Sequence, residues 1–158
     1  ASEFEVVEKE LPSQMIASIR HQGNYAESSR LFPQIGRALG RHISGKPLML
    51  CWDTEFKEND ADFEVAFPIK KRVSKKGIDV YELPSGQAHT LMHRGPYSEI
   101  HRSYKKLFSH LSRRHLESVL PSREVYHKGP GIIFKGNPRH YMTEIQVLFR
   151  PKPSPEFS

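Results

Sequence analysis

The stretch ELPSGQAHTLMHRGPYSE, from Glu82 to Glu99, has a second copy earlier in the chain, ELPSQMIASIRHQGNYAE, from Glu10 to Glu27. The two stretches match at eight of eighteen positions without a gap, whereas unrelated sequences of ordinary composition would share roughly one. A repeat of about seventy residues is too long for a solenoid unit. We therefore predict one domain built from two similar halves that face a shared surface.

The length and composition agree with a single globular domain. At 158 residues the chain can bury a real core, whereas two independent domains of half that size would each be marginal. The sequence has neither an apolar run of about twenty residues nor a signal peptide, so we expect a soluble, cytoplasmic protein with no membrane partner. A single cysteine, Cys51, excludes an internal disulfide and a cysteine-rich zinc site, and is expected to be a small buried strand residue.

The formal charge of +6 is scattered along the chain. Its densest run lies between Lys70 and Lys76 and is interpreted as a solvated connector between the halves. The sequence contains no helix-turn-helix, zinc-finger or RNA-binding motif, so we expect no direct DNA binding.

Alternating and apolar runs predict four strands in the first half, namely Phe4–Glu10, Met15–His21, Leu48–Trp52 and Asp62–Ile69. The first strand is expected to be one arm of a hairpin that turns at ELPS. Leu31, Ile35, Leu39 and Ile43 are spaced by four and predict the apolar face of a helix. Because proline is tolerated only in a first helical turn, the helix is expected to begin near Leu31, with Pro33 in that turn.

The second half repeats this order. Its expected strands are Ile78–Leu83, Gln87–Arg94, Gly131–Lys135 and Met142–Arg150, with a helix that opens at Gly95 and Pro96. Ile100, Tyr104, Leu107, Phe108 and Leu111 form its apolar stripe and are expected in the core. Pro121 is expected to end this helical region, and residues 151–158 are expected to be a disordered tail.

The predicted fold class is therefore α+β. Each half reads as β-β-α-β-β, or as β-α-β-β if its first arm is short, and both helices must cover one face of an antiparallel sheet. We expect one domain over residues 1–150, with module one at about 3–70 and module two at about 77–150. The other face of the sheet is expected to stay open.

Two glutamates point to that open face. In the last strand, Thr143, Ile145 and Val147 alternate with Glu144, and the apolar set belongs under the helix. The matching strand of the first half places Glu64 in the same way. If the modules pack about a pseudo-twofold axis, both carboxylates are expected to approach a common cleft.

Aromatic residues near strand ends and helix starts are candidate walls of this cleft. They are Trp52, Tyr25, Tyr97, Phe134 and Tyr141, and Met92 is a further candidate ligand contact. A carboxylate among aromatic faces attracts a flat, lipophilic cation through ion pairing and cation–π contacts. The same burial would raise the pKa of a carboxyl group and make Glu144 a candidate general base, so binding and hydrolysis share this signature.

No metal site or cofactor is expected. His89 and His93 share one face of a strand but lie about 13 Å apart along it, too far for one ion. The chain has no Ser-His-Asp pattern, P-loop or dinucleotide fingerprint.

Three segments resemble the GyrI-like small-molecule-binding domain, which includes effector-binding domains of multidrug-sensing bacterial transcription regulators. They are HRGPYSEI (His93–Ile100), TEIQV (Thr143–Val147) after GIIFKGNPR (Gly131–Arg139), and DFEVAFPI (Asp62–Ile69). The resemblance implies two β-α-β-β modules that form one concave antiparallel sheet, with helices on the convex face and ligand on the concave face. It implies that Glu144 is the central acid, with Trp52 and the tyrosines as wall residues.

Three functions follow from this resemblance. The first is a stand-alone binder of lipophilic, often cationic aromatic molecules, which is not an enzyme. The second is a hydrolase of strained or electrophilic compounds that uses Glu144 as base, and the third is a module that binds a protein such as gyrase. No DNA-binding segment precedes Phe4 in this sequence, so the chain is expected to be a stand-alone member of the family or an excised domain.

Overall fold

The computed structural model describes residues 5–55, 57, 59–130 and 136–154. Its strands are β1 (Val6–Leu11), β2 (Gln14–Gly23), β3 (Leu48–Cys51), β4 (Ala61–Pro68), β5 (Asp79–Leu83), β6 (Gly86–Arg94), β7 (Leu116–Lys128) and β8 (Met142–Pro151). The helices are α1 (Ser28–Leu39) and α2 (Ile100–Arg113), with short 3₁₀ turns η1 (Tyr25–Glu27), η2 (Gly40–His42), η3 (Tyr97–Glu99) and η4 (Pro138–His140).

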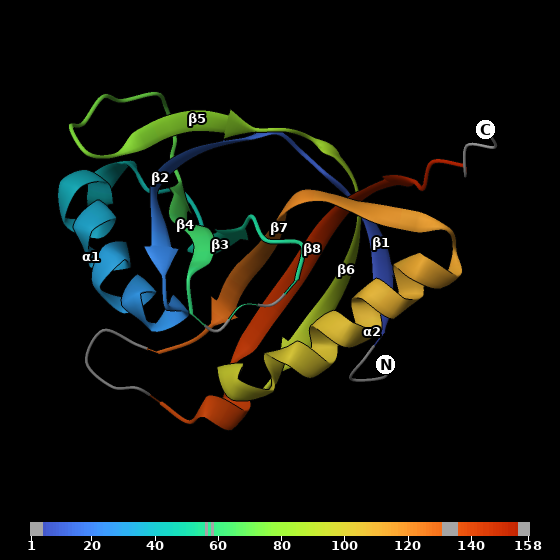
Figure 1. The fold of residues 1–158 in the computed structure, drawn as a ribbon. Coiled ribbons are helices and arrows are strands. Elements are labelled where there is room, and N and C mark those ends of the chain that lie inside the picture. Colours follow the sequence, from blue (N-terminus) through green and yellow to red (C-terminus); the bar gives the residue numbers. More distant parts are fainter. Residues whose placement is uncertain (1–4, 56, 58, 131–135, 155–158) are drawn as a thin grey trace.

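All eight strands form one curled antiparallel sheet, a half-barrel, in the order β1-β6-β8-β7-β3-β4-β2-β5. Exchanging each strand for its repeat equivalent reverses this order, so the sheet has pseudo-twofold symmetry between β7 and β3. Both helices pack on the same face and begin at the same end of the sheet, near η4 (Figure 1). The α+β class and the duplicated modules are confirmed.

The first strand of each module is exchanged. We expected β1 to form a hairpin with the strand after ELPS, but β1 pairs with β6 of the second module, and β5 pairs with β2 of the first. The ELPS turns therefore carry the chain from one module to the other. The correction has a physical reason, because a sequence repeat shows which strands are equivalent but not which edge each strand will pair with.

Helix α1 begins earlier and ends earlier than predicted. Asn24 and Glu27 form a capping box that starts η1, and α1 continues from it at Ser28, so Pro33 lies inside the helix. Pro33 is exposed, which lets the carbonyl group that loses its hydrogen bond face water. The helix ends at Leu39, and Ile43 instead bridges to Ile69.

The largest error of prediction is β7. Pro121 was expected to end this region, but it lies inside the 13-residue strand, where the register with β8 shifts between Val119 and Arg123. A strand tolerates proline at such an irregularity, because no ladder hydrogen bond is needed there. The strand predicted at Gly131–Lys135 lies outside the described residues. Pro151 was assigned to the tail but ends β8, and the Lys152 amide donates to the carbonyl of His115.

The core is divided by the sheet. On the helix face, Phe63 and Val65 pack under α1, while Ile145 and Val147 pack under α2. On the other face, a separate cluster contains Ile16, Leu48, Leu50, Ala66 and Leu83. Within the described residues, no helix is long and apolar enough to cross a membrane.

Candidate functional site

The predicted site residues divide between the two faces of the sheet. Glu144, Glu64, Trp52 and Met92 belong to the face away from the helices, as the pairing of Met92 with Glu144 and the Trp52–Glu64 hydrogen bond show. Tyr25, Tyr97 and Tyr141 belong to the helix face, and Phe134 lies outside the described residues. The structure therefore does not bring the predicted acid and the predicted tyrosines together.

Glu144 is buried and already neutralised. Lys9 Nζ lies 2.6 Å from Oε2, while His127 Nε2 and Gln146 Nε2 lie 3.2 Å and 3.0 Å from Oε1. Burial alone would raise the pKa of Glu144, but the hydrogen bonds from these three groups hold it below its usual value. Its remaining capacity for a bound cation is small.

Glu64 has the equivalent position in module one. Trp52 Nε1 donates to Oε1 at 2.7 Å, and Tyr81 Oη donates to Oε2 at 2.8 Å. Tyr81 is on the exchanged strand β5, just as Lys9 is on the exchanged strand β1. Each glutamate therefore fastens one exchanged strand to the module that it joins.

The two glutamates lie on strands that are not neighbours. Strands β8 and β4 are separated by β7 and β3, and three strand spacings amount to about 14 Å. Each carboxylate accepts hydrogen bonds from a separate set of donors, so nothing in their contacts joins them in one site.

A different glutamate, Glu124, lies at the centre of the helix face. Strands β3 and β7 pair across the pseudo-twofold axis, and the register is symmetric about the pair Met49 and Glu124. Glu124 is only 9% exposed. Its repeat equivalent is the apolar Met49, so the negative charge at the axis comes from one module alone.

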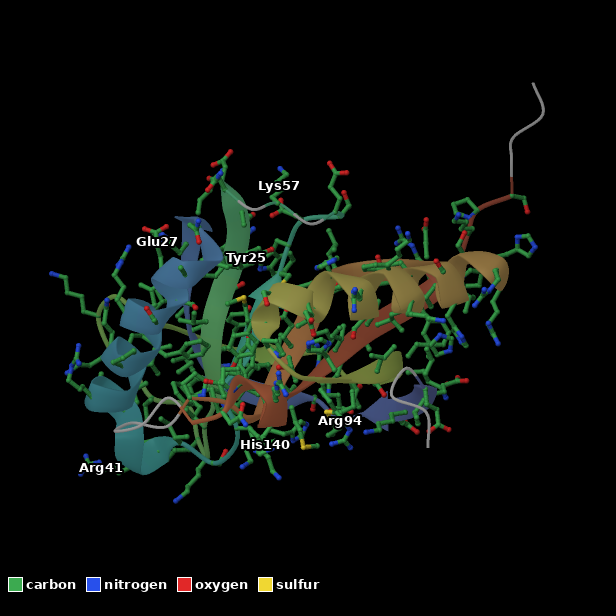
Figure 2. All side chains as sticks on the ribbon, turned by 90° about the horizontal axis from the view of Figure 1, so that it is seen from below. Tyr25, Glu27, Arg41, Lys57, Arg94 and His140 are labelled. Carbon is green, nitrogen blue, oxygen red and sulfur yellow. The ribbon has the colours of Figure 1, made fainter. Side chains whose placement is uncertain are left out.

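Tyrosines from both modules surround Glu124, and we call this group the Glu124 cluster. Tyr104 of α2 donates a short hydrogen bond to Oε2, Tyr126 Oη donates to Oε1 at 2.9 Å, and Cys51 Sγ lies 3.8 Å from Oε2. The other members of the cluster are Tyr25, Tyr97 and Tyr141. Figure 2 shows Tyr25 in the region between α1 and α2.

The ring contacts of the cluster connect the start of α2 to β7 and β8. The ring centroid of Tyr97 is 5.7 Å from that of Tyr126 and 5.2 Å from that of Tyr141. The corner before Tyr97 requires Gly95, whose φ of 120° is strained for other residues and whose amide donates to the carbonyl of Tyr141. The glycine-tyrosine corner of the repeat thus positions a ring of the cluster.

The electrostatics of Glu124 differ from those of Glu144. Burial raises the pKa of Glu124 above its usual value, although hydrogen bonds from Tyr104, Tyr126 and Cys51 oppose the shift. Glu124 forms no ion pair with any residue that the structure describes. Burial also raises the pKa of the Tyr104 and Tyr126 hydroxyls, and that of Tyr97 to about 12, so these groups remain hydrogen-bond donors.

Sequence reasoning missed Glu124, Tyr126 and the contact of the Tyr104 hydroxyl with Glu124. Glu124 and Tyr126 lie on β7, which was not predicted because it contains Pro121, and Tyr104 was assigned to the core. The repeat contained a usable signal, because module two must have a counterpart of Leu48–Cys51 before its last strand. The alternation of Glu124 and Tyr126 fits that strand.

The model of the GyrI-like small molecule binding domain matches residues 4–150. The chain belongs to the GyrI-like family. No curated protein matches the chain.

Three solved structures show the same fold. The EcmrR C-terminal domain is 24% identical, with a TM-score of 0.82 over 93% of this chain and 98% of that chain; in an EcmrR–DNA complex the match covers 57% of the EcmrR chain. SAV2435, solved bound to tetraphenylphosphonium, is 17% identical, with a TM-score of 0.64 over 92% and 94%. A protein from Listeria innocua described as a hydrolase is 13% identical, with a TM-score of 0.65 over 95% and 94%.

The GyrI-like domain is a small-molecule binding domain, and the chain shares its fold with the EcmrR C-terminal domain. Among the described residues, no group of three or more His, Cys, Asp or Glu side chains is arranged to hold a metal ion.

Proposed function

We propose that this GyrI-like domain binds lipophilic organic cations at the Glu124 cluster. One observation carries the proposal: Glu124 is a buried carboxyl group that lies among tyrosines of both modules and forms no ion pair within the described part of the chain, whereas Glu144 already has Lys9 and His127. Glu124 thus replaces Glu144 as the acid that we assign to the ligand.

The chemistry favours a cation that is large and weakly hydrated. A buried carboxylate without a counter-ion is destabilised by the loss of water, and a bound cation restores the missing partner. The faces of Tyr25, Tyr97 and Tyr126 add cation–π contacts of about 0.5–2 kcal/mol each. A small, strongly hydrated cation would lose more hydration energy than these rings return, which favours aromatic or quaternary cations.

The rings occupy the space around Glu124, so binding requires a side chain to move. Tyr97 is the best candidate, because it is 38% exposed and stands at the solvent edge of the cluster. Its ring contacts Tyr126 and Tyr141 rather than the acid itself. Rotation of Tyr97 would open a path to Glu124 while Tyr104 and Tyr126 keep their hydrogen bonds.

The comparison with SAV2435 supports the proposal, since that structure contains tetraphenylphosphonium, a lipophilic cation. We therefore use tetraphenylphosphonium as the probe and measure binding by calorimetry. Glu124→Gln is expected to weaken binding by roughly 100-fold, because it removes the charge and keeps the shape. Glu144→Gln is the matched control and is expected to leave affinity unchanged. Equal affinity of Glu124→Gln and wild type, or a loss confined to Glu144→Gln, would overturn the assignment.

Hydrolysis is the second candidate, because the raised pKa of Glu124 and two tyrosine hydroxyls also suit general acid–base chemistry. The test is turnover of strained-ring or electrophilic substrates by the wild type and by Glu124→Gln. Turnover that Glu124→Gln abolishes would favour an enzyme over a binder. A specific protein partner that still binds to Glu124→Gln would favour the interaction module.

A further inference from the structure

A cavity lies under the C-terminal half of α2, apart from the Glu124 cluster. Its volume is about 360 Å³, which is within the usual range for small-molecule sites. Its lining comes from β1, β6, α2, β7 and β8, and from Arg114, which directly follows α2. The lining residues are Val6, Glu8, His89, His110, Arg114, Leu116 and Phe149. None of them belongs to the Glu124 cluster.

The wall of the cavity combines nitrogen donors and apolar groups. Arg114 and His110 come from the end of α2, while Val6, Leu116 and Phe149 supply apolar surface. His89 is stacked on Phe149 with ring centroids 4.4 Å apart and meets His110 edge-on at 5.0 Å. An anionic head beside an apolar body matches this distribution.

The single acid in the cavity has a partner. Glu8 Oε2 lies 3.7 Å from His89 Nε2, and His89 is only 5% exposed. The other ring nitrogen, Nδ1, is buried and has no hydrogen-bond partner within the described residues, an arrangement that is costly unless something compensates for it. The Glu8 side chain is 55% exposed and lies on the His89 side of the cavity, and Arg114 with His110 supplies the donors for an anion.

The end of α2 does not repel an anion as a bare helix C-terminus would. Arg114 Nη1 donates to the carbonyl of His110 at 3.2 Å, and the Arg114 amide donates to the carbonyl of Leu111. The His115 amide donates to the carbonyl of Ser112. These carbonyl groups are occupied, and the guanidinium of Arg114 has four further N–H donors to offer.

We propose that this cavity binds a small monocarboxylate with an apolar body, with the carboxylate at Arg114 and His110 and the body against Phe149 and Leu116. Glu8 selects against ligands with several negative charges. Burial, together with Arg114, His89 and Arg113, lowers the pKa of His110, and a bound carboxylate would reverse that shift. The site is independent of the function proposed for Glu124.

The test is an NMR titration of the histidine side chains of the full chain with benzoate. Benzoate is expected to bind saturably and to raise the pKa of His110 by about one unit, because a neighbouring negative charge favours the charged imidazole. Benzamide, the neutral isostere, is expected to produce less than a tenth of this shift. An equal response to benzamide would show that the cavity recognises only the ring and would overturn the proposal.

Variants separate this site from other basic surfaces. Arg114→Gln is expected to weaken benzoate binding at least tenfold, while Arg102→Gln, on the same helix but outside the cavity, is expected to have no effect. Arg114→Gln should leave tetraphenylphosphonium affinity unchanged, and Glu124→Gln should leave benzoate affinity unchanged. The failure of one proposal can therefore be distinguished from the failure of the other. Absence of a saturable His110 shift, or equal shifts in wild type and Arg114→Gln, would overturn the inference.

Discussion

Glu144 and Glu124 lie on opposite faces of the sheet and have opposite kinds of partner. On the face away from the helices, Glu144 has the cationic partner Lys9 and the imidazole of His127, while Glu64 has the neutral donors Trp52 and Tyr81. On the helix face, Glu124 has hydroxyl and thiol donors and forms no ion pair among the described residues, although the His93 imidazole is near enough to help lower its pKa. The difference teaches that burial of an acid does not identify a binding site by itself. The state of its partners does.

The largest expected effect concerns the paired face. Glu144→Ala removes the acceptor for Lys9, His127 and Gln146 and leaves a cavity, so we expect a loss of about 3 kcal/mol in the free energy of unfolding. Urea denaturation measures this loss. Lys70→Ala, in the exposed connector, is the control and should change stability by less than about 0.5 kcal/mol. A Glu144→Ala variant as stable as the wild type would show that Glu144 does not fasten β1.

Glu124→Gln is expected to have the opposite sign. The substitution removes a desolvated carboxylate, and the tyrosine hydroxyl that loses its acceptor can rotate to accept from the new amide N–H, so the unliganded domain should gain about 1–2 kcal/mol at neutral pH. Thermal denaturation of the unliganded protein measures the gain. A clear loss of stability would show that the charged form of Glu124 is stabilised in the fold, and would remove the distinction between the two faces.

The pH dependence sharpens the same contrast. The pKa of Glu124 is raised in the folded state, so its favourable contribution is present below the unfolded value of about 4.3 and is lost as the pH rises through the folded pKa. The pKa of Glu144 is lowered, so its contribution is present above about 4.3 and is lost as the pH falls through the folded pKa. The advantage of Glu124→Gln over wild type should therefore grow with pH, and Glu144→Gln should lose its disadvantage in acid. Denaturation midpoints at several pH values check both signs.

The smallest effect tests the partners of Glu64. Tyr81→Phe removes one donor while Trp52 keeps the other, and we expect a loss of about 1 kcal/mol. Tyr25→Phe, on the helix face, should change cation affinity less than Glu124→Gln does. Tyr81→Phe should leave tetraphenylphosphonium affinity unchanged, and a measurable change in that affinity would show that the two faces are coupled.

Much of the fold could be predicted from the repeat and from hydrophobic periodicity. The match between residues 10–27 and 82–99 indicated two equivalent modules, and the parity of β4 and β8 placed Phe63 and Ile145 under the helices and Glu64 and Glu144 away from them. These features are local, because alternation in a strand fixes which side chains share a face. The same reasoning did not predict β7, because Pro121 was interpreted as the end of a helical region. A strand tolerates proline at a register irregularity, and that irregularity depends on the pairing with the neighbouring strand.

The sequence by itself determined the duplication, the α+β class and the kinds of residue, an acid and several tyrosines, from which the proposed site is built. Tertiary structure alone decided which acid is available. Strand exchange brings Lys9 of β1 to Glu144 and Tyr81 of β5 to Glu64, and the pairing of β3 with β7 places Glu124 on the pseudo-twofold axis among tyrosines of both modules. The partners of a carboxyl group come from distant parts of the chain. Periodicity therefore predicts which face of the sheet an acid lies on, but not whether a cationic side chain will neutralise it. The glycine-tyrosine corners of the repeat begin both helices, and the deciding charge lies outside them on β7.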